Sequence, residues 1–328
     1  MQIKNNILKG LKKTYRIITF PTFENPPCEL DRYRANDMIY KLLSDDKACM
    51  ISRFGTIEIG IVNNYLTVHS NESLFRKSFN YITDNTGLPW WDKLYYKSMH
   101  LNAGIFPTNI ETLERFSERY LQDIPYIDLL GSFNYAERFM PLRRDVINVH
   151  LECLYPFFVD NPWTRVLEGK KVLVIHPFVA TIQHQHKQHT NLFDNPMVYP
   201  DYQLITLKAV QSNAGAEVPF SNWFDALRFM EDEISKIDFD FSIIGCGAYG
   251  LPLAAHIKRL GKKAIHLGGG SQLLFGIKGK RWDNNSYRGP NSPNLMTNYS
   301  KLYNPYWTRA SNSETPKGAN RVEGACYW

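Results

Sequence analysis

Short runs of hydrophobic residues alternate along the chain with segments in which hydrophobic residues recur every three or four positions. The runs are typical of strands covered on both faces, and the recurring spacing is typical of amphipathic helices. The predicted strands lie at 48–54, 126–130, 171–175, 203–207, 239–244 and 263–267. The predicted helices include one capped by Asn36, one that begins near Thr56, and others at 72–83, 91–101, 109–122, 222–237 and 251–261. This alternation predicts an α/β fold: a doubly wound, Rossmann-like, mostly parallel sheet with helices on both faces.

Composition divides the chain into three parts. Residues 30–282 carry the strand and helix pattern without a linker and are predicted to form one α/β domain, with motif-bearing halves at about 30–160 and 161–282. Residues 1–29 form a basic lead, predicted to be a solvated helix packed on the domain; contact with an anionic membrane surface is the alternative. Residues 283–328 are rich in Asn, Tyr, Gly and Pro, and their aromatic side chains predict an extension wrapped on the domain.

Charge and cysteine content narrow the classes of protein. A formal net charge of +6 over 328 residues suits anionic ligands but is too small and too dispersed to predict nucleic-acid binding. The five cysteines are widely spaced without a CxxC pair, which argues against a zinc centre or a disulfide framework. No run approaches the ~18 apolar residues of a membrane span. We therefore expect a cytoplasmic protein, with peripheral contact at the inner face of the cell membrane as the alternative.

The clearest local motif is a glycine-rich turn at 245–250. Gly245, Gly247 and Gly250 directly follow a predicted strand and directly precede a predicted helix. Glycines let a ligand approach the backbone, and the N–H groups at a helix N-terminus favour phosphate. The next strand ends in His266 and three glycines, without the acid that a dinucleotide site needs for its ribose. A bound diphosphate is therefore predicted here, with Lys280 and Arg281 assigned to it as well.

A second motif follows the first predicted strand. Arg53, Gly55 and Thr56 stand between that strand and the next helix, and Glu58 lies in the first helical turn. Arg53 is predicted to pair with a phosphate, and Gly55 and Thr56 to lie beside it. Glu58 has two interpretations, because acids in the first turn also stabilise any helix through its dipole.

Together these segments resemble the GT-D fold glycosyltransferases, a bacterial family formerly described as a domain of unknown function. The matches are Arg53, Gly55 and Glu58, then the segment 102–107, then the segment 245–270, so that the resemblance covers roughly 30–282. It implies transfer of a sugar from a nucleoside diphosphate sugar to a glycan or lipid-linked acceptor, in the synthesis of a bacterial surface polysaccharide such as capsule or O-antigen. It also implies that Glu58 ligates Mn²⁺ or Mg²⁺. Thr56, however, stands where the family has the Asp of its Asp-x-Glu motif.

Sugar transfer defines what such a site must do. Negative charge builds on the leaving diphosphate, and either a cation held by carboxylates or helix N-termini with Arg and Lys can stabilise it. An inverting transfer also needs a base for the acceptor hydroxyl, for which Glu58, His176 and Asp225 are the candidates. Two alternatives stay open: a Rossmann-type enzyme with another nucleotide cofactor, such as a dehydrogenase or a methyltransferase, and a catalytically silent binding protein of the same fold.

Overall fold

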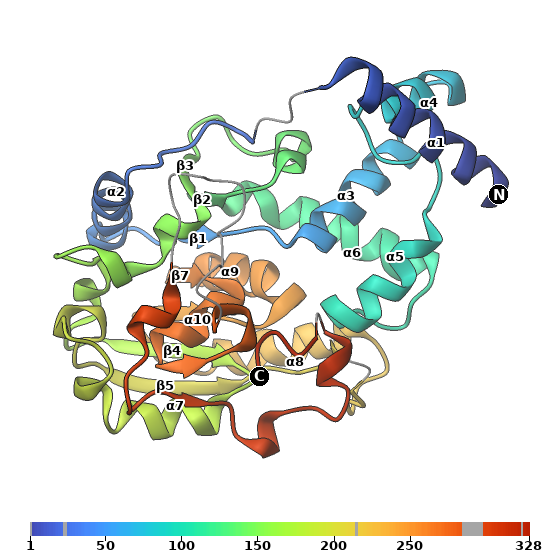
Figure 1. Cartoon of the computed structure of the whole chain (residues 1–328). Helices are drawn as coiled ribbons and strands as arrows, with labels where there is room; N and C mark the ends of the chain where they lie inside the picture. The colour runs from blue at the N-terminus through green and yellow to red at the C-terminus, as the bar shows by residue number, and fades with distance from the viewer. Residues whose placement is uncertain (1, 22–24, 214–215, 284–297, 323) are drawn as a thin grey trace.

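A central sheet of seven parallel strands organises the chain (Figure 1). The computed structural model describes residues 2–21, 25–213, 216–283, 298–322 and 324–328. The strand order is β3-β2-β1-β7-β6-β4-β5. The strands are β1 (Met50–Ser52), β2 (Leu129–Ser132), β3 (Ile147–His150), β4 (Lys171–His176), β5 (Gln203–Lys208), β6 (Phe241–Ile244) and β7 (Lys263–His266). The predicted doubly wound α/β fold is confirmed.

Two hydrophobic cores lie on the two faces of the sheet. In β4, Val172 and Val174 point into one core and Leu173 and Ile175 into the other, which is why this strand is apolar from Val172 to Ile175. One face is covered by α3 (Thr56–Val68), α6 (Ile110–Asp123), α8 (Trp223–Ser235) and α9 (Gly250–Arg259). The other is covered by α2 (Arg32–Ser44), α7 (Val179–His186) and α10 (Ser271–Leu274).

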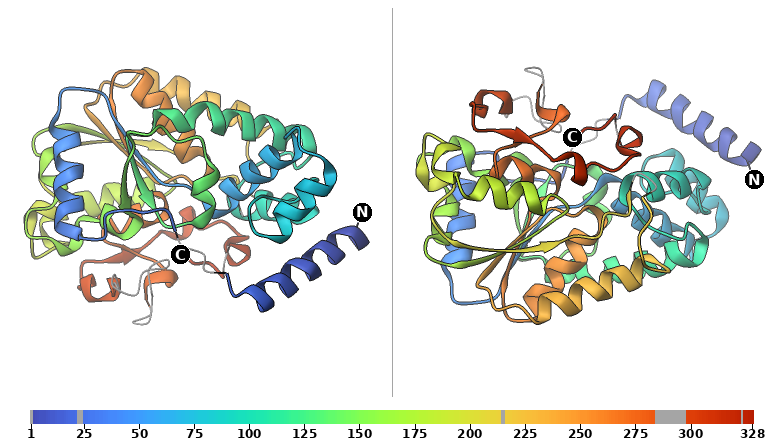
Figure 2. Two further views of the ribbon diagram at one scale, coloured as in Figure 1. Left: turned by 90° about the horizontal axis from the view of Figure 1, so that it is seen from above. Right: turned by 90° about the horizontal axis from the view of Figure 1, so that it is seen from below.

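The remaining elements lie outside these two layers. α1 (Gln2–Thr19) packs beside α4 (Leu74–Ile82), and α5 (Lys93–Ser98) continues into a π-helical turn at Met99–Ala103. Two short strands, β8 (Ile277–Lys278) and β9 (Thr308–Arg309), pair in a second small sheet. Part of the predicted extension, 284–297, lies outside the described residues, and the described residues 298–322 and 324–328 run across the carboxyl edge of the main sheet (Figure 2). Within the described part of the chain, no helix is long and apolar enough to cross a membrane.

Two sequence predictions need correction. Asn36 does not cap a helix: α2 begins at Arg32, and the cap is Asp31, whose side chain accepts from Tyr33 N–H. Asn36 lies inside α2, where its amide donates to the Asn161 carbonyl and accepts from Trp163 N–H. The edge strand β3 was not predicted, because Asn148 and His150 interrupt its short hydrophobic run.

The strand order places a crevice between β6 and β4. From these neighbouring strands the chain continues in opposite directions: β4 leads outward to β5 through α7 on one face, and β6 leads to β7 through α9 on the other. Where the direction of the connections reverses, the connections that follow two adjacent strands lie on opposite faces of the sheet. Ligands bind in the opening that this leaves at the carboxyl ends of the two strands. The 53–58 turn follows β1, and the 268–270 turn follows β7.

Candidate functional site

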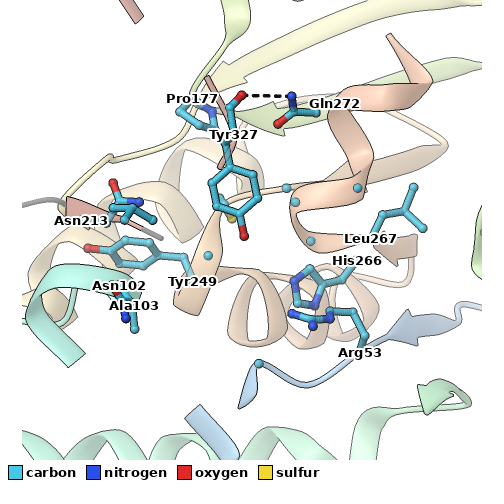
Figure 3. A pocket seen from close by; sticks show the side chains of 18 of the residues that line it. Arg53, Asn102, Ala103, Pro177, Asn213, Tyr249, His266, Leu267, Gln272 and Tyr327 are labelled. Atoms are coloured by element: carbon cyan, nitrogen blue, oxygen red, sulfur yellow. Dashed lines mark hydrogen bonds between the residues drawn. The ribbon is translucent and has the colours of Figure 1, made fainter. Parts of the chain in front are cut away.

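A cavity of about 390 Å³ lies at this carboxyl edge (Figure 3). Its wall includes residues that follow β1, β2, β4, β5, β6 and β7, together with Asn102 and parts of the segment 322–328. Gly55 and Gly247 both line it. The 53–58 and 245–250 turns therefore open onto one cleft. Among the predicted site residues, those that line the cavity are Arg53, Gly55, Thr56, Glu58, His176, Gly245, Gly247 and Arg281.

Arg53 supplies a positive charge at the end of β1. Its guanidinium lies 4.9 Å from the centre of the Phe133 ring, and its side chain passes over Gly268, where an added Cβ would stand 3.2 Å from the Arg53 Cδ. Burial, assisted by the neighbouring Arg53 charge, lowers the pKa of His266 to about 3. A half-buried cation thus stands beside a histidine that is neutral at physiological pH.

Glu58 lies in the first turn of α3 and is largely buried. Its carboxylate folds back against Gly55, so a Cβ at position 55 would overlap it. The same carboxylate lines the cavity, so both interpretations of Glu58, at the helix N-terminus and at the site, agree with its position. Thr56 is exposed at the rim, with its hydroxyl 3.5 Å from the Asn134 amide.

The 245–250 turn is held by close packing rather than by side-chain caps. A Cβ at Gly245 would overlap the Ser271 hydroxyl and stand 2.7 Å from the His176 ring, and one at Gly250 would overlap the His266 ring. Gly247 has a left-handed φ of +59° with no atom within 4 Å of an added Cβ. Glycine is therefore required at 245 and 250 by space and at 247 by backbone conformation.

His176 is placed in the cavity wall as a hydrogen-bond donor. Phe178 N–H donates to its Nδ1 at 3.0 Å, so the proton of the neutral ring resides on Nε2. Burial lowers the pKa of His176 to about 3. A ring with its only acceptor nitrogen already engaged does not serve as the general base, which removes one of the three candidates.

Three predicted site residues do not line the cavity: Gly250, which packs against the His266 ring, and Asp225 and Lys280. Asp225 sits in the first turn of α8, where it accepts from the Asn222 amide, and it does not line the cavity. Lys280 also lies outside the wall, and its ammonium donates to the Gly324 carbonyl at 3.3 Å. Its neighbour Arg281 does reach the cavity.

The glycines of the 268–270 turn, which follows β7, are covered by tyrosine rings. A Cβ at Gly269 would overlap Tyr327, and one at Gly270 would overlap Tyr155. Arg281 donates to the Tyr327 hydroxyl at 3.3 Å, and the Gln272 amide donates to the Tyr327 carbonyl at 3.1 Å. In Figure 3 the Tyr327 ring projects into the cavity between Tyr249 and His266. Sequence reasoning missed both tyrosines; the aromatic content of the extension was the available signal for Tyr327.

Asn213 is a further polar residue of the wall. Its Oδ1 is buried, and no hydrogen-bond partner reaches it within the described residues. Gly104, at a φ of +72°, lies so close that an added Cβ would stand 2.8 Å from Asn213 N. The turn at Gly104 and the segment after β5 therefore pack closely together beside the cavity.

The cavity does not fit the metal site that the resemblance implied. Glu58 is the single Asp or Glu among the described residues of its wall, and no group of three or more His, Cys, Asp or Glu side chains suited to a metal occurs in the described parts of the chain. Mn²⁺ and Mg²⁺ take several oxygen ligands. Cationic side chains and backbone N–H groups are what this wall offers instead.

No protein-family model, no curated protein and no solved structure matches the chain.

Proposed function

We propose that the protein is a glycosyltransferase that uses a nucleoside diphosphate sugar and holds the donor's diphosphate between the 53–58 and 245–250 turns. The observation that carries the proposal is that both turns and two arginines, Arg53 and Arg281, line one cavity at the point where the strand order reverses. The resemblance of these turns to the GT-D motifs supports the same reaction.

Helices α3, α7 and α9 begin at this edge of the sheet, and the N-terminus of α7 already holds an anion. The Glu314 carboxylate accepts from Ala180 N–H at 2.7 Å and from Thr181 N–H at 3.2 Å, in the first turn of α7. The Glu58 carboxylate lies at the N-terminus of α3, against Gly55. α9 begins next to the cavity, and its cap residue Tyr249 accepts no capping hydrogen bond, so its first-turn N–H groups are suited to an anionic ligand.

The charges in the wall match the leaving group of sugar transfer. As the glycosidic bond of the donor breaks, negative charge builds on the diphosphate, and fixed positive charge nearby lowers the barrier. Arg53 and Arg281 supply this charge without a metal ion.

Glu58 is the remaining candidate in the cavity for the base that takes the proton of an acceptor hydroxyl. Asp225 lies outside the wall, and His176 is engaged at its acceptor nitrogen. Following the resemblance, we propose a glycan or lipid-linked acceptor belonging to a surface polysaccharide such as capsule or O-antigen. Glu58→Gln should therefore abolish transfer and leave donor binding and the melting temperature nearly unchanged.

Calorimetric titration with UDP, GDP and CDP tests the proposal, with NAD and S-adenosylmethionine as competing ligands and with and without Mn²⁺. We expect one nucleoside diphosphate to bind without Mn²⁺, and Arg281→Ala to weaken it by about tenfold or more. Lys280→Ala is the matched control, since it removes the neighbouring cation outside the cavity. Binding of NAD or S-adenosylmethionine alone would overturn the proposal, and diphosphate binding without turnover of any sugar nucleotide would favour a silent binding protein.

A further inference from the structure

Helix α1 presents its charged side to the body of the protein. Lys9 lies 3.0 Å from Asp92, and Lys12 lies 2.6 Å from Asp84. Arg16 donates to both oxygens of Asp84, through Nε at 2.7 Å and Nη2 at 2.5 Å. Positions 9, 12 and 16 fall on one side of a helix, so the contact between α1 and the domain is largely ionic.

The opposite side of α1 is apolar and faces away from the protein. Ile7, Leu11 and Ile18 are spaced by four and seven residues, which places them on one stripe, and their exposed fractions are 56%, 48% and 71%. The neighbouring helix α4 likewise exposes Leu74, Phe75 and Phe79. The views of Figure 2 show α1 at the margin of the molecule, clear of the sheet.

The orientation of α1 is the reverse of that of a surface helix in a monomeric soluble protein, which turns its apolar stripe toward the core. Exposed apolar groups gathered in this way mark a surface that is covered by something else. The charge of α1 indicates which kind of partner covers this apolar surface. α1 carries five cations and no Asp or Glu. Lys4 is exposed beside the apolar stripe, and Lys13 is exposed on the flank next to Lys9; neither forms an ion pair among the described residues.

We propose that the outer side of α1 binds the surface of an anionic lipid bilayer. The helix lies parallel to the bilayer, with Ile7, Leu11 and Ile18 among the acyl chains and Lys4 at the lipid phosphates. The ion pairs with Asp84 and Asp92 hold it in that orientation. A second copy of the chain is a poorer partner, because two such sides would bring together like charges. This inference does not depend on the reaction at the cavity.

Co-sedimentation with vesicles tests the proposal, using phosphatidylcholine with about 30% phosphatidylglycerol against phosphatidylcholine alone. The full chain should bind the anionic vesicles at least about tenfold more tightly. The triple variant Ile7→Ser/Leu11→Ser/Ile18→Ser should lose at least about tenfold of that affinity, and Lys4→Gln should lose several-fold and become less sensitive to salt.

The matched control is Leu30→Ser/Phe229→Ser/Leu260→Ser, which removes three apolar side chains of similar exposure (44%, 44% and 41%) elsewhere on the surface. It should bind vesicles as the unchanged protein does. Equal binding to both kinds of vesicle, or unchanged binding by the α1 triple variant, would overturn the proposal. So would a dimer in light scattering that the α1 triple variant converts to monomer while vesicles bind neither form. Nucleotide binding by the same variants, measured by titration, should be unchanged. A failure of the membrane proposal can therefore be distinguished from a failure of the proposed function.

Discussion

Two glycine turns stand next to one another at the carboxyl edge of the sheet, and different side chains pack against them. The 245–250 turn is packed by two buried neutral histidines, His176 against Gly245 and His266 against Gly250. The 268–270 turn is packed by two tyrosines, Tyr327 and Tyr155. At the first turn Gly247 stays open, with no atom within 4 Å of an added Cβ, whereas rings cover Gly269 and Gly270 at the second. The same sequence signal thus leaves Gly247 open beside the cavity in one turn and accompanies close packing at Gly269 and Gly270 in the other.

The largest effect is expected from Gly245→Ala. The new Cβ would overlap the Ser271 hydroxyl and stand 3.0 Å from the Gly268 carbonyl oxygen, which belongs to the backbone. We expect the free energy of unfolding to fall by about 3 kcal/mol, measured by urea denaturation. The control is Gly10→Ala, in a helix with open space around the new methyl group; it should be neutral or stabilising. Equal stability of the two variants would contradict the packing described.

Gly269→Ala tests the tyrosine-packed turn. The methyl group would displace the Tyr327 ring, and we expect a loss of about 2 kcal/mol in unfolding free energy. In a Tyr327→Ala background the same substitution should cost much less, because the obstructing ring is gone. A double-mutant cycle measures this coupling, expected at about 1 kcal/mol or more. Strict additivity would mean that Tyr327 does not rest on Gly269.

Lowering the pH should destabilise the protein through the two histidines that pack against the 245–250 turn. The pKa values of His176 and His266 are about 3 in the folded protein and about 6.5 in the unfolded chain. The unfolded state therefore binds more protons between these limits, so stability falls as the pH drops below about 6.5 and levels off near 3.

Each histidine should contribute a slope of about 1 kcal/mol per pH unit. His266→Gln should flatten the measured dependence of unfolding free energy on pH by that amount, and the exposed His184→Gln should leave it unchanged. The same slope in all three proteins would show that His266 is not buried in its neutral form.

The smallest effect is expected from Gly247→Ala. No atom opposes the new methyl group, so only the left-handed backbone is strained, at about 1 kcal/mol. Gly247→Asn should cost less, since Asn tolerates this conformation. Thermal unfolding compares the two variants, and a loss as large as that of Gly245→Ala would mean that the space beside Gly247 is occupied.

Six of the seven strands of the main sheet and both cavity turns could be predicted, because each depends on local sequence. Buried parallel strands are continuously apolar, and Gly245, Gly247 and Gly250 sit in a fixed order between strand and helix. The approach of Tyr327 could not be predicted, because it depends on the path of a segment that crosses the sheet edge after the last strand. The tautomer of His176 depends on one backbone amide, that of Phe178, whose direction is set only once the turn after β4 has formed.

Glu314 and Tyr327 both belong to the segment that follows β7, and that segment is translated after every strand of the main sheet. During synthesis the seven strands can pair while the ribosome still holds residues 299–328. One wall of the cavity and the carboxylate at the start of α7 are then added to a sheet that already exists. Chains interrupted before residue 299 should keep the sheet and lack the part of the cavity wall that Val322, Tyr327 and Trp328 supply.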